Sequence, residues 1–271
     1  MRRIKILFFW LVINKNNVSF SELFKFLFKP KVNVIAKKHI KQIVIAEDYE
    51  VSFHSSGYIL YWPKIFPINR LNQVVAETFD TEDWHYYQKK HTEVELGEII
   101  LDIGTAEGLL PISVVDKCNH IYMVEPSQSF CKCLEKTFFN YSKKTTIFNT
   151  AVGNEDGIIS FDENSLDGMV SKESTKNTNK ISIFKIDTLF KNNEKITYLK
   201  ADIEGFEEEM LKGAEQTIKL NKPKIAITTY HTQNNPEEII SLIKSFVPEY
   251  KYYVKGIYEK TPKPVLIHFW I

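Results

Sequence analysis

The stretch at residues 99–108, IILDIGTAEG, joins an apolar run to a turn that carries two glycines. Ile99 to Ile103 is almost entirely apolar, as expected for a strand buried on both faces of a parallel sheet. Gly104 and Gly108 are four residues apart, so the turn is not the GxGxxG of dinucleotide-binding proteins. We expect a strand, a tight turn whose glycines let the backbone approach a ligand, and then a helix.

Two acidic residues beside this turn indicate the charge of that ligand. Asp102 and Glu107 would repel a phosphate, which dinucleotide sites hold at a helix N-terminus. They suit a cation, and S-adenosylmethionine carries both a sulfonium and an ammonium group. An ordinary strand–helix turn without a ligand is the alternative.

The chain beyond residue 98 alternates strands with helices. Strands are expected at residues 121–124, 146–148, 197–201 and 224–229, and helices at 109–118, 128–140, 207–220 and 236–246. Residues 157–161 and 181–186 are predicted to pair around a polar loop at 162–180. This alternation favours a parallel, doubly wound α/β sheet. Two closing strands, 251–254 and 265–270, have no strong helix between them and indicate an antiparallel edge strand at the C-terminus.

The first 83 residues are predicted to form a smaller α+β segment for substrate binding, a lid or oligomerisation. Helices are expected at 18–28 and 71–78 and strands at 42–46 and 58–62. The apolar run at 6–13 is too short for a transmembrane helix and lacks a signal-peptide cleavage site, so we expect a buried element. Residues 84–87, Trp-His-Tyr-Tyr, suit a packed lid or a binding edge. We place the start of the second domain, 84–271, there.

Composition excludes several classes of protein. The 271 residues are 44% apolar and 25% charged, as in globular domains. The 35 basic and 34 acidic residues nearly cancel and only three residues are arginine, so the chain lacks the basic footprint of a nucleic-acid-binding protein. Three cysteines suit a reducing compartment, and we expect a cytoplasmic protein.

Further candidate residues follow the second and third strands. Glu125 ends the second strand, 21 residues after Gly104, where an acidic residue can accept both ribose hydroxyls of an adenosyl ligand. Ser127 is predicted to cap the next helix. The small residues at 149–154, NTAVGN, can flank an adenine ring. A solvated strand end and a plain turn are the respective alternatives.

The fourth and fifth strands end in titratable residues. Lys200, Asp202 and Glu204 crowd one strand end, and like charges so close require a lysine, another cation or a metal. If the strand continues, its period of two puts Asp202 and Glu204 on one face. Helix capping is the alternative for Glu204, and the interpretation that we favour for Glu207. His231 ends the next strand and should stand beside Asp202 as a general base or metal ligand. The histidines at 39, 54, 91, 120 and 268 are assigned no role.

Together these stretches resemble the FkbM family of S-adenosylmethionine-dependent methyltransferases, from about Trp84 to Val254. The most specific part is residues 199–214, LKADIEGFEEEMLKGA, which is similar to the family's K-x-D-x-E-G-x-E-x-x-x-L-x-G-A signature. The LDIGTAEG turn, the VEP strand end and AVGN follow in the family's order. One departure is Thr105-Ala106-Glu107, where family members often have Ala-Asn.

The resemblance implies a Rossmann-like class I methyltransferase fold with a seven-stranded, mostly parallel sheet, and O-methylation of a sugar hydroxyl. With the lysine-rich composition, it points to bacterial surface-polysaccharide (capsule) or related glycan biosynthesis. The expected partner is a small-molecule sugar, nucleotide-linked or part of a glycan; we expect no nucleic acid and no transmembrane segment, and leave a homo-oligomer open. The alternatives are an N-methyltransferase or nucleic-acid methyltransferase, and a catalytically idle adenosyl-binding scaffold.

The site predictions divide into three sets. Cofactor contacts are expected from Asp102, Gly104, Thr105, Gly108, Glu125, Pro126, Ser127, Ala151, Val152 and Asp202. Catalytic roles are expected for Lys200, Asp202, Glu204 and His231. Asp202, Glu204 and His231 would hold Mg²⁺ or Mn²⁺ near the acceptor hydroxyl; alternatively, His231 acts directly as a base that Asp202 orients. Lys200 would balance the carboxylates or bind an acceptor phosphate.

Overall fold

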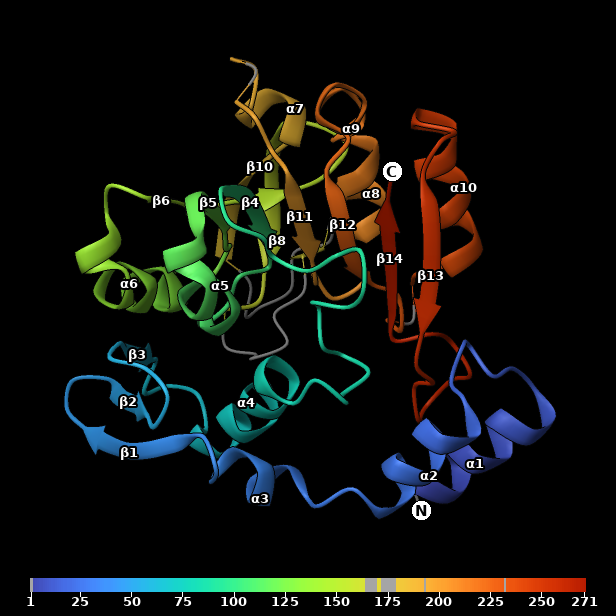
Figure 1. The fold of residues 1–271 in the computed structure, drawn as a ribbon. Coiled ribbons are helices and arrows are strands. Elements are labelled where there is room, and N and C mark those ends of the chain that lie inside the picture. The colour runs from blue at the N-terminus through green and yellow to red at the C-terminus, as the bar shows by residue number, and fades with distance from the viewer. Residues whose placement is uncertain (1, 164–169, 172–178, 193, 232) are drawn as a thin grey trace.

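A seven-stranded sheet lies at the centre of the computed structural model, which describes residues 2–163, 170–171, 179–192, 194–231 and 233–271. The strand order is β13-β14-β12-β11-β4-β5-β6 (Figure 1). These strands are β4 (Glu98–Ile103), β5 (Cys118–Val124), β6 (Thr145–Phe148), β11 (Tyr198–Ala201), β12 (Lys224–Thr228), β13 (Lys251–Lys255) and β14 (Leu266–Trp270). The sheet is mostly parallel, which confirms the predicted class I methyltransferase fold.

The C-terminal strand is antiparallel to both of its neighbours, as predicted, but it does not lie at the edge. β14 is inserted between β12 and β13, so β13 is the edge strand. The reason is hydrophobic burial: the first four residues of β14 are buried, whereas β13 begins with two exposed residues and tolerates solvent.

Helices cover both faces of the sheet and complete the doubly wound arrangement. α5 (Leu109–Val114) and α6 (Gln128–Thr137) contribute to one apolar core, and α8 (Glu207–Lys212), α9 (Glu215–Asn221) and α10 (Pro236–Phe246) to the other. Ser127 caps α6, because its side chain accepts a hydrogen bond from Phe130 N. The helix predicted at 207–220 is divided at Gly213, where an added Cβ would lie 1.9 Å from the carbonyl oxygen of Gly153.

A smaller sheet follows β6, in the order β7-β10-β8-β9. Its strands are β7 (Ala151–Val152), β8 (Gly157–Phe161), β9 (Val170–Ser171) and β10 (Asn179–Phe184), and α7 (Ile186–Leu189) comes next in the chain. β8 and β10 pair antiparallel, which confirms the predicted strand pair. Most of the polar loop predicted between them lies outside the described residues.

The front segment lies at the end of the sheet where the parallel strands finish (Figure 1). It comprises α1 (Arg2–Val12), α2 (Phe20–Phe28), α3 (Val32–Ala36), β1 (Ile40–Ile45), β2 (Tyr49–Phe53), β3 (Ile59–Trp62) and α4 (Leu71–Phe79). Trp62 and Phe66 pack against Phe130 of α6, with ring centroids 5.8 and 5.0 Å apart. The front segment therefore shares a core with the sheet domain, and the division at residue 83 stays a prediction.

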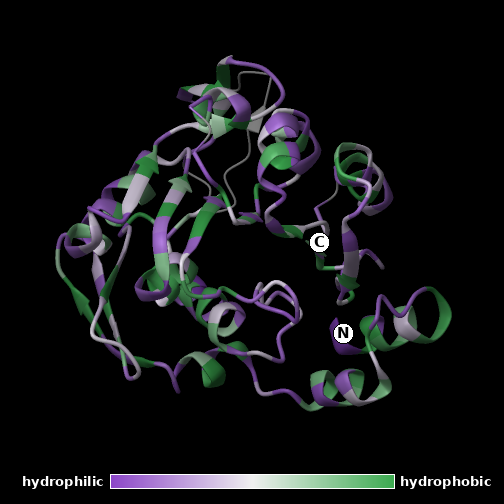
Figure 2. Cartoon of the chain, turned by 45° about the horizontal axis from the view of Figure 1, so that its top comes forward, coloured by the Kyte–Doolittle hydropathy of each residue, from purple (hydrophilic) through white to green (hydrophobic). Residues whose placement is uncertain are grey.

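The expectation that residues 6–13 form a buried element is wrong. They belong mostly to α1, in which Ile6 is the one fully buried residue, and Figure 2 shows apolar residues along this outlying helix. α1 packs against the rest of the protein along one side only, so its other side faces solvent. None of the helices in the described ranges is both long and apolar enough to cross a membrane.

Candidate active site

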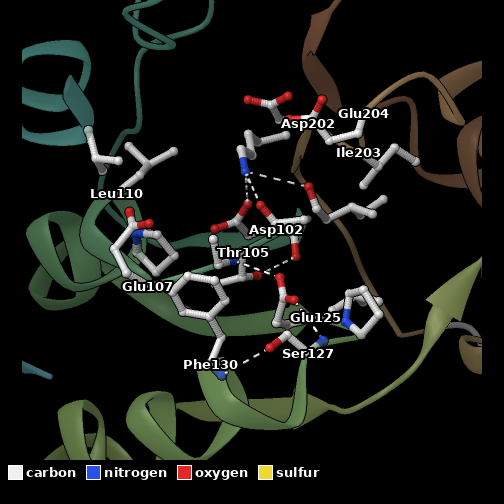
Figure 3. A pocket seen from close by; sticks show the side chains of 18 of the residues that line it. Asp102, Thr105, Glu107, Leu110, Glu125, Ser127, Phe130, Asp202, Ile203 and Glu204 are labelled. Atoms are coloured by element: carbon white, nitrogen blue, oxygen red, sulfur yellow. Dashed lines mark hydrogen bonds and ion pairs between the residues drawn. The ribbon is translucent and has the colours of Figure 1, made fainter. Parts of the chain in front are cut away.

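A pocket lies at the carboxyl ends of β4, β5 and β11, where open α/β sheets bind ligands (Figure 3). One side is lined by residues from 102–107, 124–127 and 150–152, which follow three successive strands of the large sheet. The other side is lined by Asp202 to Glu204, by Tyr230, by Gln73 and Glu77 of the front segment, and by His85 and Tyr87, which follow that segment. The pocket thus joins the sheet domain to the front segment.

The two glycines of the first turn are required by contacts within the protein. Gly104 and Gly108 have φ angles of +69° and +77°, which residues other than glycine rarely adopt. A Cβ on Gly104 would lie 1.9 Å from the carbonyl oxygen of Asp202, and a Cβ on Gly108 would lie 2.5 Å from Leu134 Cδ2. Gly104 lines the pocket and Gly108 does not, so the expected contact of Gly108 with the cofactor stays a prediction.

Asp102 and Lys200 form a buried ion pair beneath this turn. Lys200 Nζ lies 2.9 Å from Asp102 Oδ1 and donates a hydrogen bond of 2.6 Å to the carbonyl oxygen of Gly104. Burial raises the pKa of Asp102, and the Lys200 ammonium opposes that shift. Lys200 therefore balances a carboxylate, one of its two predicted roles, and Asp102 adds less negative charge to the pocket than expected.

Glu125 is held in place at the end of β5 by two backbone groups. Its carboxylate accepts hydrogen bonds of 2.8 Å from Ala106 N and from Ser127 N (Figure 3). Burial raises the pKa of Glu125 to about 7, against these two hydrogen bonds. The same cause raises the pKa of Glu107 to about 7.

The structure brings the predicted cofactor residues together with one exception. All of them except Gly108 line the pocket: Asp102, Gly104, Thr105, Glu125, Pro126, Ser127, Ala151, Val152 and Asp202. These residues follow different strands of the sheet. They lie close together because the carboxyl ends of parallel strands meet at one edge of the sheet.

Asp202 lies between two histidines. Its Oδ1 is 3.7 Å from His231 Nε2, and its Oδ2 is 3.5 Å from His85 Nε2 and accepts a hydrogen bond of 2.8 Å from Tyr87 Oη. Burial would raise the pKa of Asp202, but the two histidines, Lys200 and Tyr87 lower it overall. Asp202 is therefore ionised at neutral pH.

Sequence reasoning missed His85 and Tyr87 as individual site residues. They contact Asp202 from a segment more than 110 positions earlier in the chain. His85 Nε2 also lies 3.3 Å from Tyr230 Oη. The sequence feature that points to them is the aromatic, polar-tipped stretch at 84–87, which is predicted to form a lid or a binding edge.

Glu204 reaches the cluster through a turn and not through a continued strand. β11 ends at Ala201, and Glu204 has a φ of +54°, so the predicted shared strand face of Asp202 and Glu204 is wrong. The tight turn into α8 brings Glu204 Oε2 to 3.2 Å from His231 Nε2. The structure nevertheless gathers Asp202, Glu204 and His231, the three residues predicted to act together.

The sequence interpretation also missed the role of Glu207 in the site. It begins α8, as expected for a capping residue, but its side chain is fully buried and lies 2.9 Å from His231 Nδ1. It also accepts hydrogen bonds from Asn234 Nδ2 at 2.8 Å and Thr228 Oγ1 at 2.9 Å. Glu207, rather than Asp202, therefore orients His231. The sequence feature that could have indicated a role for Glu207 in the site is its fixed position in the K-x-D-x-E-G-x-E pattern.

His231 carries a proton at neutral pH. Burial lowers its pKa, but the hydrogen bond that it donates to Glu207 and the charges of Asp202, Glu207 and Glu204 raise it to about 9. The imidazolium offsets part of the negative charge of the three surrounding carboxylates.

The same cluster has the donor set of a cation site. Ligand atoms of Asp202, Glu207 and His231 lie within 4.8 Å of one another. His231 Nε2 is buried, and within the described ranges it makes no hydrogen bond of good geometry. Glu207 accepts the hydrogen bond of His231 Nδ1, so Nε2 could bind a cation together with Asp202 and Glu204 once it loses its proton. That is the usual arrangement in which a carboxylate orients a metal-binding histidine. The residues present therefore fit Mg²⁺ or Mn²⁺.

Comparisons with known proteins show which family and fold the chain resembles. The family profile described as "Methyltransferase FkbM domain" matches residues 102–252. The structure of methyltransferase FkbM from Methylobacillus flagellatus KT is 21% identical, with a TM-score of 0.52 over 73% of this chain and 54% of that chain. This chain thus spans about half the length of that protein, and the likeness shows a shared fold.

Two further structures are more distant. Precorrin-6y C5,15-methyltransferase from Geobacter metallireducens GS-15 is 7% identical (TM-score 0.42, 67% of this chain and 84% of that chain). An rRNA methylase from Streptococcus thermophilus is 9% identical (TM-score 0.42, 65% and 87%). No curated protein matches the sequence significantly. Since the family profile covers more than half of the residues, the chain belongs to the FkbM family of S-adenosylmethionine-dependent methyltransferases.

Proposed function

We propose that this protein transfers a methyl group from S-adenosylmethionine to a sugar hydroxyl in the synthesis of a bacterial surface polysaccharide (capsule) or a related glycan. The observation that carries the proposal is one pocket with two unlike sides. Glu125 and the turn at 102–107 line the first side, and Asp202, Glu204 and the front segment line the second. The first side suits the nucleoside of the cofactor and the second an acceptor hydroxyl.

On the cofactor side, Glu125 would accept hydrogen bonds from the ribose hydroxyls. Ala151 and Val152 are buried, apolar and part of the pocket wall, which suits an adenine ring. The carboxylates at the junction of the two sides suit the positive charge of the ammonium and sulfonium groups.

On the acceptor side, the hydroxyl oxygen attacks the methyl carbon in line with the carbon–sulfur bond. That bond breaks, its electron pair stays on sulfur as S-adenosylhomocysteine forms, and the hydroxyl proton passes to a base. His231 can accept this proton only after it loses its own, whereas Asp202 is already ionised. Positioning of the oxygen in line with the methyl group supplies most of the rate enhancement.

A divalent cation held by Asp202, Glu204 and His231 Nε2 would supply Lewis acidity at the acceptor oxygen. The protein's own contribution is to fix the positions of these ligand atoms. Glu207 fixes the imidazole, and Tyr87 fixes the carboxylate of Asp202.

Removal of divalent cations tests this part of the proposal. We expect EDTA to lower turnover on the order of 10²-fold, with recovery on addition of Mg²⁺ or Mn²⁺, because a metal contributes several kcal/mol to such steps. We also expect Glu204→Gln to weaken Mn²⁺ binding measured by electron paramagnetic resonance, while Glu209→Gln, at a carboxylate paired with Lys212, leaves it unchanged. Full activity in cation-free protein would refute the metal version.

The pH dependence of cofactor binding tests the role of Glu125. Its pKa of about 7 means that the carboxylate, the better acceptor for two hydroxyls, forms between pH 6 and pH 8. We therefore expect calorimetry to show tighter binding of S-adenosylhomocysteine as the pH rises through 7. In Glu125→Gln, affinity at pH 8 should fall about 10- to 100-fold and lose this dependence, since hydrogen bonds to charged groups contribute about 1.5–3 kcal/mol.

Glu107→Gln is the matched comparison, because the pKa of Glu107 is raised to the same value. If the pH dependence persists in Glu125→Gln and disappears in Glu107→Gln, Glu125 is not the ribose ligand. Absence of any binding of S-adenosylmethionine or S-adenosylhomocysteine would defeat the whole proposal. A screen of methyl transfer to nucleotide sugars and glycan fragments identifies the acceptor.

A further inference from the structure

The first two helices expose a large apolar surface. Ile4, Phe8, Leu11 and Val12 are spaced i, i+4, i+7 and i+8 along α1, so they lie on one helix face. Phe20, Phe24 and Phe28 are spaced i, i+4 and i+8 along α2. Each of these seven residues is more than half exposed, between 53% and 71%. We call these seven residues the apolar face.

The opposite sides of both helices are anchored to the protein, so the exposure does not result from a detached segment. Ile6 of α1 and Leu23 of α2 are each 1% exposed, and Phe26 stacks on Trp84 with ring centroids 4.5 Å apart. Trp10 and Phe20 have ring centroids 6.3 Å apart, which places the two helices side by side. The apolar face is therefore presented on a fixed support.

The charge of this region is strongly positive, although the whole chain is nearly neutral. Residues 1–41 contain ten Lys or Arg residues and one acidic residue, an excess of nine positive charges, whereas the full chain carries +1. Some of these cations pair internally, as Lys29 does with Asp80 and Asp83. Seven lysines of this region are exposed, of which Lys25 pairs with Glu82: Lys5, Lys15, Lys25, Lys31, Lys37, Lys38 and Lys41.

We propose that α1 and α2 dock the protein on the surface of an anionic lipid membrane. Helices that lie in the membrane interface have this composition: phenylalanine and leucine on one face, and lysine on the neighbouring surface. Anionic lipids attract such lysines, at about 1 kcal/mol for each one near the surface. A second copy of the chain would meet the apolar face with the same positive excess, and the like charges would repel. Charge complementarity thus favours lipid over self-association.

The docked orientation would bring the pocket toward the lipid. Figure 1 shows α1 and α2 at the end of the sheet where the parallel strands finish, and the pocket lies at those strand ends. This inference does not depend on the proposed reaction, because vesicle binding is measured without substrate.

Vesicle sedimentation with the full chain tests the proposal. We expect the partition coefficient onto phosphatidylcholine vesicles containing phosphatidylglycerol to exceed that onto pure phosphatidylcholine at least about tenfold, and to fall as salt is raised. The combined change Phe20→Ser, Phe24→Ser and Phe28→Ser should remove binding to both vesicle types. The combined change Lys31→Glu, Lys37→Glu and Lys38→Glu should remove the preference for phosphatidylglycerol.

Matched controls change equally exposed residues elsewhere. Phe139→Ser, Ile158→Ser and Leu220→Ser remove three apolar side chains that are 68–77% exposed, and should leave binding intact. The charge control reverses three exposed lysines outside this region and should leave the preference for phosphatidylglycerol intact: Lys132→Glu, Lys143→Glu and Lys191→Glu. Circular dichroism and light scattering check folding and mass. Equal binding by the phenylalanine variant and its control would overturn the proposal, as would a stable dimer that this variant dissociates.

Discussion

Replacing His231 with alanine is expected to lower kcat by about 10²–10⁴-fold, the usual contribution of a positioned acid–base group. The imidazole lies within 4 Å of Asp202 and Glu204, and Glu207 fixes its orientation. It is needed whether it receives the acceptor proton or ligates a cation, so both versions of the mechanism predict the loss. The measurement is the rate of S-adenosylhomocysteine formation with the acceptor found by screening.

Two further measurements show that the effect is chemical. Binding of S-adenosylhomocysteine by His231→Ala should stay within about threefold of the wild type, because His231 is not one of the residues that line the pocket and meets it only through Asp202 and Glu204. His54→Ala, at an exposed position of the front segment, should retain full activity. A loss of less than about threefold in His231→Ala would contradict both versions of the mechanism.

Gly104→Ala is expected to destabilise the protein by about 3–5 kcal/mol, among the largest effects of a single substitution. Two costs add: a non-glycine residue at a φ of +69°, and a Cβ placed 1.9 Å from the backbone oxygen of Asp202. A backbone atom cannot move aside as the end of a flexible side chain can. The measurement is urea unfolding followed by circular dichroism.

Gly157→Ala is the matched control for this prediction. Its added Cβ would meet no atom within 4 Å, so we expect a change of less than about 1 kcal/mol in the free energy of unfolding. A Gly104→Ala protein as stable as Gly157→Ala would show that the turn relaxes, and that the contact between the two strand-end turns is not rigid.

The fold could be predicted where burial dictates the pattern. The apolar run of β4 and the alternation that follows it have one stable solution, a parallel sheet covered on both faces. The same reasoning brought His231 beside Asp202, since neighbouring parallel strands end at one edge. These inferences need only local sequence and the geometry of a sheet.

The remainder depends on contacts that local sequence does not encode. His85 and Tyr87 reach Asp202 because the stretch that contains them, between the front segment and β4, lies against the strand ends. Glu204 arrives through a left-handed turn that the strand pattern could not reveal. The apolar run of α1 looks like core until the structure shows that one side of it has no neighbour in the described chain.

The division of the pocket between two parts of the chain has a consequence for engineering and for divergence among related enzymes. The lining that we propose for the cofactor comes from residues 102–152, whereas Gln73, Glu77, His85 and Tyr87, which we propose for the acceptor, precede residue 98. Under the proposed function, we expect substitutions at Gln73 or Glu77 to change acceptor preference and to leave the nucleoside contacts unchanged. Such a redesign must keep the packing of Trp62 and Phe66 on Phe130, because that seam holds the two walls at a fixed separation.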